Sequence, residues 1–290
     1  MKKFFKHLMM VMGIVLTGMI VFDVIYAYVY EHGEPRNKTE YILNLKNKRI
    51  DYVFLGSSRV ENHISTKLVE ERTGKKALNL GVQGATLDDA FLLLKIMVHN
   101  NITTEKVFLQ VDDSYNIEDP SIIVGTESLP YIRSNKIIRQ HRKDNNDYNL
   151  NYYVPFYRYS KNDYKIGFRE FIGSLVGKKI HINFSDGFDP IDQKFKTTEY
   201  MLPGTIKNEN GVLSAISLFC KQNSIEMVYF CAPYCSEIGN IDYVTKLKER
   251  VPDLVDFSQS MTNTIYFKDC GHLNEKGALL FTEKLIETCL

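Results

Sequence analysis

An apolar run close to the start of the chain constrains its fold more than any other feature. The run extends from Leu8 to Tyr30, is interrupted only by Asp23 and a few small polar residues, and follows three lysines among the first six residues. A helix needs ~20 apolar residues to cross the hydrocarbon core of a bilayer, so this run is long enough to span one. The alternative is a helix buried in a protein core, which the flanking lysines argue against. The sequence therefore predicts a membrane-spanning helix over residues 1–30.

The residues at the end of this run indicate an anchor that is retained. A cleaved signal peptide has a shorter apolar stretch followed by a small-x-small cleavage site. Here the run ends in YAYVY (Tyr26 to Tyr30), with no second small residue at that spacing, and its tyrosines are typical of an interfacial aromatic belt. Lysines before the span favour a cytoplasmic N-terminus. We therefore expect a single-pass membrane protein, with a linker over 31–48 and a domain over 49–290 on the extracytoplasmic side.

The composition excludes several classes of protein. Hydrophobic residues make up 44% of the chain and charged residues 24%, which is ordinary for a globular protein and argues against disorder. The 36 Lys and Arg residues nearly balance the 35 Asp and Glu residues. A nucleic-acid-binding protein usually carries a basic excess, so nucleic acid is not an expected partner.

The five cysteines are too few for a disulfide framework in a chain of this length, and their odd number leaves at least one without an intramolecular partner. Cys231 and Cys235 flank three residues and could pair, but this spacing is a weak signal. Small buried hydrophobes are the favoured interpretation for Cys220 and Cys231. No set of Cys and His stands at zinc-ligand spacing, so we expect neither a metal nor another cofactor.

Short runs of β-forming residues alternate with helical patterns after the anchor. Apolar runs predict five buried strands, over 50–55, 76–80, 106–111, 225–231 and 254–257. Helical patterns fall around 65–72, 86–99, 211–222, 241–249 and 274–288. Thr86 and Asp89 form a capping-box-like start of the second of these helices. The order predicts an α/β fold with a parallel five-stranded sheet and helices on both of its faces.

The stretch from about 115 to 203 interrupts this alternation. It is rich in Asn, Tyr, Lys and Asp, and its hydrophobic periodicity is poor. We interpret it as a cap-like insertion of loops and short helices over one end of the sheet, because insertions of this kind cluster at the carboxyl ends of strands, where ligands bind. Its tyrosines either stack on a sugar or peptide or pack inside the cap.

Two short motifs carry nucleophilic chemistry. The first strand ends in Gly56-Ser57-Ser58-Arg59, and a serine on a sharp turn after a buried strand can expose its hydroxyl above the sheet. Near the other end of the chain stands Asp269-Cys270-Gly271-His272. This spacing lets the carboxylate bind one ring nitrogen of the histidine, which leaves the other nitrogen free to act as a base. Each motif alone is a weak signal, because Gly, Ser and Asp are common loop residues.

The ordered set of motifs resembles the SGNH (GDSL-like) hydrolase superfamily. Gly56-Ser57-Ser58 is similar to the G-D-S block of that family, with Ser58 at the nucleophile position. The segment NLGVQGAT (79–86) is similar to the N-x-G-x-x-G-x-T block, with Gly84 at the oxyanion-hole glycine. Asp269 and His272 match D-x-x-H, as the orienting acid and the base. The resemblance covers most of the chain from about residue 51, apart from the insertion.

The resemblance implies a flavodoxin-like three-layer α/β/α fold, in which the N–H groups of Ser58 and Gly84 form the oxyanion hole. A G-S-S block behind a membrane anchor is similar to envelope proteins that handle acyl groups, such as the teichoic-acid D-alanyl transfer protein and polysaccharide O-acetylation proteins.

One block departs from the family. The third block, G-x-N-D after strand three, supplies an Asn side chain to the oxyanion hole, but the matching segment here runs Val111-Asp112-Asp113-Ser114-Tyr115-Asn116. Loss of one oxyanion donor costs ~10²–10³ in turnover. Ser114 and Asn116 are candidate substitutes that could contact substrate. Arg59 either binds an anionic group of the substrate or forms a structural ion pair.

Three functions follow from these motifs. The first is a membrane-anchored serine esterase that removes an O-acyl group from a cell-envelope glycan or a lipid-linked substrate. The second is an O-acyltransferase that uses the same serine with a membrane acyl-donor partner. The third is a catalytically weak scaffold subunit, which the altered third block supports and the retained serine, aspartate and histidine oppose.

Overall fold

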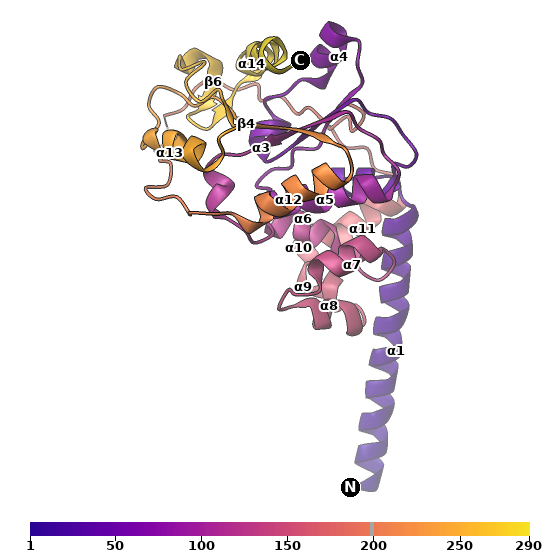
Figure 1. Ribbon diagram of the computed structural model, residues 1–290. Helices are drawn as coiled ribbons and strands as arrows, with labels where there is room; N and C mark the ends of the chain where they lie inside the picture. The colour runs from indigo at the N-terminus through magenta and orange to yellow at the C-terminus, as the bar shows by residue number, and fades with distance from the viewer. Residues whose placement is uncertain (198–199) are drawn as a thin grey trace. The chain divides into compact units, whose positions relative to one another are not determined.

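The computed structural model describes residues 1–197 and 200–290 (Figure 1). Their contacts divide the chain into two compact units, each made of two segments. We call residues 1–44 with 125–180 the helical unit, and residues 45–124 with 181–290 the α/β unit. The middle of the expected insertion therefore belongs to the same unit as the N-terminal segment. Its expected position over one end of the sheet stays a prediction.

The helical unit begins with α1 (Lys2–His32), the one helix among the described residues that is long and apolar enough to cross a membrane. A short helix, α2 (Lys38–Asn44), follows inside the segment that we expected to be a linker. The other elements of the unit are η2 (Leu129–Tyr131), α7 (Lys136–Arg142), α8 (Tyr148–Tyr153), α9 (Tyr157–Lys161), α10 (Asp163–Ile166) and α11 (Phe168–Leu175). A further helix, α6 (Ile122–Glu127), crosses the boundary between the two units.

The carboxyl-terminal half of α1 is held by polar and aromatic contacts inside the helical unit. The carboxylate of Asp23 is buried and forms ion pairs with Arg158, at 2.9 Å, and with Arg133. The ring of Tyr26 stacks on that of Phe171 in α11, with centroids 4.0 Å apart. A buried ion pair costs several kcal/mol when one partner is removed. These contacts therefore make α1 an integral part of its unit.

The α/β unit contains a five-stranded parallel sheet in the order β2-β1-β3-β4-β5. Its strands are β1 (Tyr52–Leu55), β2 (Ala77–Asn79), β3 (Lys106–Gln110), β4 (Glu226–Cys231) and β5 (Val255–Asp256). The expected α/β class and the parallel five-stranded sheet are confirmed, and each predicted strand is found within two residues of its expected ends. The strand order places β1 between β2 and β3, so the residues that follow β1 lie at the carboxyl edge of the sheet, beside those that follow the central strand β3.

Helices cover the two faces of this sheet. They are α3 (Ser58–Glu61), α4 (Thr66–Thr73), α5 (Leu87–His99), α12 (Gly211–Gln222), α13 (Asp242–Arg250) and α14 (Glu275–Cys289). Two short 3₁₀ turns, η1 (Asp113–Asn116) and η3 (Thr264–Tyr266), and the antiparallel pair β6 (Phe267–Asp269) and β7 (His272–Leu273) complete the unit. The predicted capping box is present at the start of α5, where the N–H of Thr86 donates to Asp89 at 2.9 Å.

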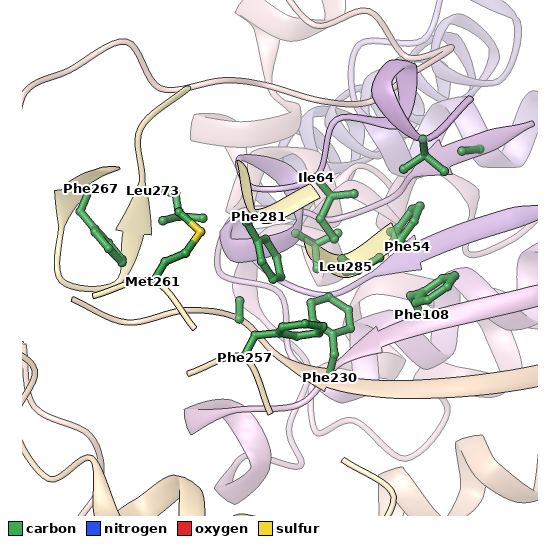
Figure 2. Packing of buried hydrophobic residues seen from close by; sticks show 14 of the residues in the cluster. Phe54, Ile64, Phe108, Phe230, Phe257, Met261, Phe267, Leu273, Phe281 and Leu285 are labelled. Carbon is green, nitrogen blue, oxygen red and sulfur yellow. The ribbon is translucent and has the colours of Figure 1, made fainter. Parts of the chain in front are cut away.

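The core between the sheet and α14 is aromatic. Phe54 of β1 stacks on Phe108 of β3, with ring centroids 4.7 Å apart. Phe230 of β4 packs near Phe281 of α14, and Leu285 follows one turn later on the same face of that helix (Figure 2). Successive residues of β1 and β3, whose side chains point to opposite faces of the sheet, are nearly all buried. Both faces of the sheet are therefore covered.

A disulfide joins Cys235, in the loop after β4, to Cys270, in the turn between β6 and β7. The pairing of Cys231 with Cys235, which the sequence left open, does not form, because Cys231 lies buried at the end of β4 as a free thiol. The N–H of Cys235 also donates to the carbonyl of Cys270 at 3.2 Å. The cross-link therefore fixes the turn that carries the Asp269-Cys270-Gly271-His272 motif.

Replacing both cysteines, as Cys235→Ala with Cys270→Ala, is expected to lower the free energy of unfolding of the α/β unit. The bond closes a loop with a sequence separation of 35 residues. Chain entropy assigns about 3–4 kcal/mol to a loop of that length. Urea unfolding of the full chain in detergent, followed by circular dichroism, measures the change. Cys289→Ala, a half-buried free thiol, is the matched control. A loss below about 1 kcal/mol in the double variant would contradict this role of the disulfide.

Candidate active site

The turn after β1 presents Ser58 at the carboxyl edge of the sheet. Gly56 has a φ of +154°, and a side chain there would come within 2.5 Å of the Gln110 side chain, so only glycine fits. Ser57 then caps α3, because its hydroxyl accepts from the N–H of Arg59, and its own N–H donates to Gln110 at 2.8 Å. These contacts fix Ser58 as the first residue of α3, where its hydroxyl faces the pocket described below.

Ser58 and the predicted acid and base form one continuous relay. The hydroxyl oxygen of Ser58 lies 2.8 Å from Nε2 of His272. Nδ1 of the same ring lies 2.9 Å from Oδ1 of Asp269. A carboxylate can only accept, so Nδ1 carries the proton and Nε2 is left to accept from the serine. The fold thus unites residues 214 positions apart in the chain into the arrangement of a serine hydrolase.

Asp269 is held in the ionised form. Its Oδ1 also accepts the backbone N–H groups of Gly271 and His272, each at 2.9 Å. Partial burial opposes ionisation, but these bonds, the His272 ring and nearby Lys268 outweigh it, so the pKa of Asp269 lies below its usual value. A carboxylate fixed in this way orients the imidazole and stabilises the imidazolium that forms during catalysis.

His63 lies behind this relay, a position for which the sequence carried no signal. Its ring is buried and stands edge-on to that of His272, with centroids 6.1 Å apart. Nε2 of His63 accepts the N–H of Leu273, the residue after His272, at 2.9 Å. Burial, together with the charges of Arg59 and His272, holds the pKa of His63 well below its usual value. A neutral His63 therefore supports the strand that carries the candidate base, His272.

His63→Gln is expected to make stability less dependent on pH. The unfolded chain binds a proton at His63 below about pH 6.5, whereas the native chain does not. The contribution of a neutral His63 is therefore complete above that pH and is lost as the pH falls, by up to about 1.4 kcal/mol per unit. Glutamine offers an acceptor to Leu273 but does not titrate.

The measurement is the free energy of unfolding in urea at several pH values between about 5 and 7.5, for the wild type and His63→Gln. His99→Gln, at an exposed position on α5, is the control and is expected to keep the wild-type slope. Equal slopes for His63→Gln and the wild type would show that His63 is not the titrating group.

A pocket of about 220 Å³ opens beside Ser58 and His272. Gly84 lines it with a φ of +69°, a conformation that glycine adopts without strain. Among the described residues, no protein acceptor takes the backbone N–H of Ser58 or of Gly84. The pocket is lined by Ser57, Ser58, Arg59, Gly84, Ala85, Thr86, Asp113, Ser114, Ile117, Tyr200 and His272.

The two candidate donors of the third block occupy different places. Ser114 lines the pocket. Asn116 does not, because its amide donates to the carbonyl of Thr205 at 2.8 Å and accepts the N–H of Lys207 at 2.9 Å. Of the two substitutes that the sequence suggested, Ser114 is therefore the one that the fold brings to the pocket.

Arg59 forms an ion pair with one of the two carboxylates of the third block. Its guanidinium forms a buried ion pair with Asp112 at 2.9 Å. It also donates to the carbonyls of Ala232 and Pro233 and lies 3.6 Å from the ring centroid of Tyr234. The structure thus shows the ion pair that was one of the two alternatives for Arg59. Burial, with a contribution from the neighbouring Asp113, raises the pKa of Asp112 to about 7 despite the opposing charge of Arg59.

Tyr200 and Asp113 form a second polar pair at the pocket, which sequence reasoning missed. The hydroxyl of Tyr200 donates to Oδ2 of Asp113 at 2.6 Å, and both side chains line the pocket. Burial and the Asp113 charge raise the pKa of Tyr200, so this phenol stays protonated. One tyrosine of the expected insertion is thus placed at the site, but nothing in its local sequence distinguished it from the others.

Comparisons with known proteins add two distant structural similarities. No protein-family model and no curated protein matches the chain. A protein from Desulfitobacterium hafniense DCB-2, described as lipolytic and of the G-D-S-L family, is 10% identical, with a TM-score of 0.41 over 83% of this chain and 99% of its own. A protein from Streptococcus pneumonia, described as a platelet activating factor, is 12% identical, with a TM-score of 0.39 over 97% of this chain and 98% of its own. At these TM-scores, the argument for function rests on the geometry of the site.

Among the described residues, no group of three or more His, Cys, Asp or Glu side chains is arranged to hold a metal ion. The pocket brings a serine and a histidine together, with an aspartate behind the histidine, and these groups can support nucleophilic chemistry.

Proposed function

We propose that the chain is a membrane-anchored serine ester hydrolase of the SGNH type. The observation that carries the proposal is the relay from Ser58 through His272 to Asp269, with 2.8 Å and 2.9 Å between successive partners. A serine, a histidine and an aspartate at these distances activate the serine hydroxyl as a nucleophile. The parallel sheet with the nucleophile after β1 agrees with the fold that the family resemblance implied.

The reaction proceeds in two balanced halves. The Ser58 oxygen attacks the acyl carbon of an ester while Nε2 of His272 takes the hydroxyl proton, and the N–H groups of Ser58 and Gly84 stabilise the oxyanion. His272 then returns this proton to the leaving alcohol, which departs and leaves acyl-Ser58. Water, deprotonated by His272, next attacks the acyl carbon. Collapse of this second intermediate releases the acid and restores the Ser58 hydroxyl.

The altered third block is the main objection to this mechanism, and the contacts of its carboxylates weaken the objection without removing it. A free carboxylate near the oxyanion would repel the developing negative charge. Of the two carboxylates in this block, Asp112 is paired with Arg59, whereas Asp113 lines the pocket and accepts from the hydroxyl of Tyr200. An Asn donor is still absent from the block. Unless the Ser114 hydroxyl donates to the oxyanion, we expect a turnover number ~10²–10³-fold below that of a hydrolase with three oxyanion donors.

The proposed location is the extracytoplasmic side of the membrane. Three lysines before α1 favour a cytoplasmic N-terminus. The disulfide between Cys235 and Cys270 supports the same orientation, because such bonds persist in oxidising compartments and are rare in the cytosol. An enzyme in this place meets O-acylated glycans and lipid-linked precursors of the cell envelope, which are the proposed substrates.

The test measures release of free acid from ester substrates by the full chain in detergent micelles. The panel contains O-acetylated oligosaccharides and p-nitrophenyl acetate, with and without a sugar or polyol acceptor. Release of acetate that depends on Ser58 supports the hydrolase. Acyl transfer to the acceptor with little free acetate would instead support the O-acyltransferase. No acyl-Ser58 and no release from any ester would overturn both enzymatic functions in favour of the scaffold.

A further inference from the structure

The depth of α1 in a bilayer determines where the rest of the helical unit lies. From Leu8 to Phe22, α1 exposes nearly all of its apolar side chains, but these 15 residues measure only about 22 Å at 1.5 Å per residue. A hydrocarbon core of ~30 Å needs ~20 residues and so extends to about Ala27. This last part of the span contains Asp23 and Tyr26, whose side chains are buried by other parts of the helical unit.

The residues that cover Asp23 and Tyr26 therefore lie at the level of the outer leaflet. Phe156, between α8 and α9, packs against Phe22 with ring centroids 5.8 Å apart, and its backbone N–H donates to Asp23 at 2.9 Å. Phe171 of α11 stacks on Tyr26. In Figure 1, α8 and α9 extend farther along α1 toward its N-terminus than α7 and α11 do.

The same helices expose apolar side chains to the surroundings. On α11, Phe168, Ile172 and Leu175 are spaced by four and three residues and share one face, and they are 65%, 36% and 57% exposed. Tyr153 of α8 is 68% exposed. An exposed apolar face on a helix opposite its packed side is typical of helices that lie in a membrane interface.

The charge of this region is complementary to an anionic surface. Residues 125–180 contain 11 Lys and Arg against 5 Asp and Glu, a balance of +6 in a chain whose net charge is +1. Several of the basic side chains are exposed: Lys136, Lys143, Lys161, Arg169, Lys178 and Lys179. Basic residues near an anionic bilayer are attracted to its surface.

We propose that the helical unit is a membrane-interface element, in which Tyr153 and Phe168 enter the outer leaflet and the basic side chains contact anionic lipid headgroups. The inference rests on the proposed membrane-spanning anchor. It explains why a charged residue is tolerated inside the span, because Asp23 is paired with Arg158 and Arg133 of the same unit. The α/β unit is then tethered to a platform at the lipid surface.

The absence of tryptophan from the chain allows a direct test. Single tryptophans are placed by Tyr153→Trp and Phe168→Trp in the helical unit, by Leu16→Trp in α1, and by Leu218→Trp at an exposed position of α12 in the α/β unit. Each full-length variant is reconstituted in vesicles of equal parts phosphatidylglycerol and phosphatidylcholine. The acyl chains carry bromine either near the headgroup or near the methyl end.

We expect Tyr153→Trp and Phe168→Trp to lose about half of their fluorescence to bromine near the headgroup and less to bromine near the methyl end, as for side chains at an interface. Leu16→Trp is expected to be quenched most by the deeper bromine, and Leu218→Trp by neither. Replacing phosphatidylglycerol by phosphatidylcholine is expected to weaken the quenching of the two interface tryptophans.

The possible failures are distinguishable. If Tyr153→Trp and Phe168→Trp resemble Leu218→Trp while Leu16→Trp is quenched, the anchor stands and the interface element is overturned. If Leu16→Trp is not quenched, the anchor itself is wrong. Quenching that does not change without phosphatidylglycerol overturns the contact with anionic headgroups. Labelling of Ser58 by a fluorophosphonate, measured on every variant, verifies that each one is folded.

Discussion

Ser58→Ala is expected to abolish covalent labelling by a fluorophosphonate probe and to lower ester hydrolysis by at least about 10⁴-fold. The Ser58 hydroxyl, 2.8 Å from Nε2 of His272, is the proposed nucleophile, so alanine removes the atom to which the acyl group is transferred. Mass spectrometry of the labelled full chain locates the adduct. His272→Ala is expected to prevent labelling as well, because the base that takes the serine proton is then absent.

Ser57→Ala is the matched control, since it removes an adjacent hydroxyl from the same turn. The Ser57 hydroxyl donates to Gln110 at 3.0 Å and caps α3, so its loss is expected to leave the adduct on Ser58. Labelling of Ser58→Ala at an unchanged rate, or an adduct on Ser57 in the wild-type chain, would overturn the assignment of the nucleophile.

Asp269→Asn is expected to lower the turnover number by about 10⁴-fold with a smaller change in KM. The carboxylate of Asp269 accepts from Nδ1 of His272 and holds the proton on that nitrogen. An amide in its place can donate to Nδ1 instead, which puts the proton on Nε2 and blocks proton transfer from Ser58. The variant is expected to fold, because asparagine has the size and shape of aspartate, although an amide that donates to Nδ1 no longer accepts the N–H groups of Gly271 and His272 at the same atom.

Initial rates of ester hydrolysis and circular dichroism are the measurements for Asp269→Asn. Asp253→Asn, at an exposed position of the α/β unit, removes the same charge away from the pocket and is expected to keep wild-type turnover. Because the pKa of Asp269 lies below its usual value, its own titration is not expected to limit activity above about pH 5. A loss smaller than about ten-fold would contradict the role of Asp269 in orienting the base.

Much of the α/β unit could be predicted from local patterns. Short runs of β-forming residues predict the buried strands, and Thr86 with Asp89 indicates the start of a helix. Each of these signals could be recognised because it depends only on neighbours in sequence. The three catalytic candidates were identifiable because a turn after a strand and a D-x-x-H spacing are themselves local. The relay that they form across 214 positions became visible only in the fold.

The roles of residues without a local sequence pattern could not be predicted. His63 and Tyr200 reach the site through contacts with Leu273 and Asp113, which are distant from them in the chain. Cys235 pairs with Cys270 rather than with Cys231 because the loop after β4 lies against the β6–β7 turn. For Arg59, the sequence left open a substrate contact or an ion pair. The ion pair depends on the burial of Asp112 beside it.

The amino-acid sequence by itself determined the long apolar helix, the order of strands and helices, and which residues are the candidate nucleophile, base and acid. All of these are encoded by residue type and spacing within a few turns of chain. Only the tertiary structure decided which cysteines pair, that residues 125–180 join the N-terminal helix, and that Asp23 of this helix is paired with Arg158. Such outcomes depend on distances between segments that are remote in sequence, and these distances exist only once the chain is packed.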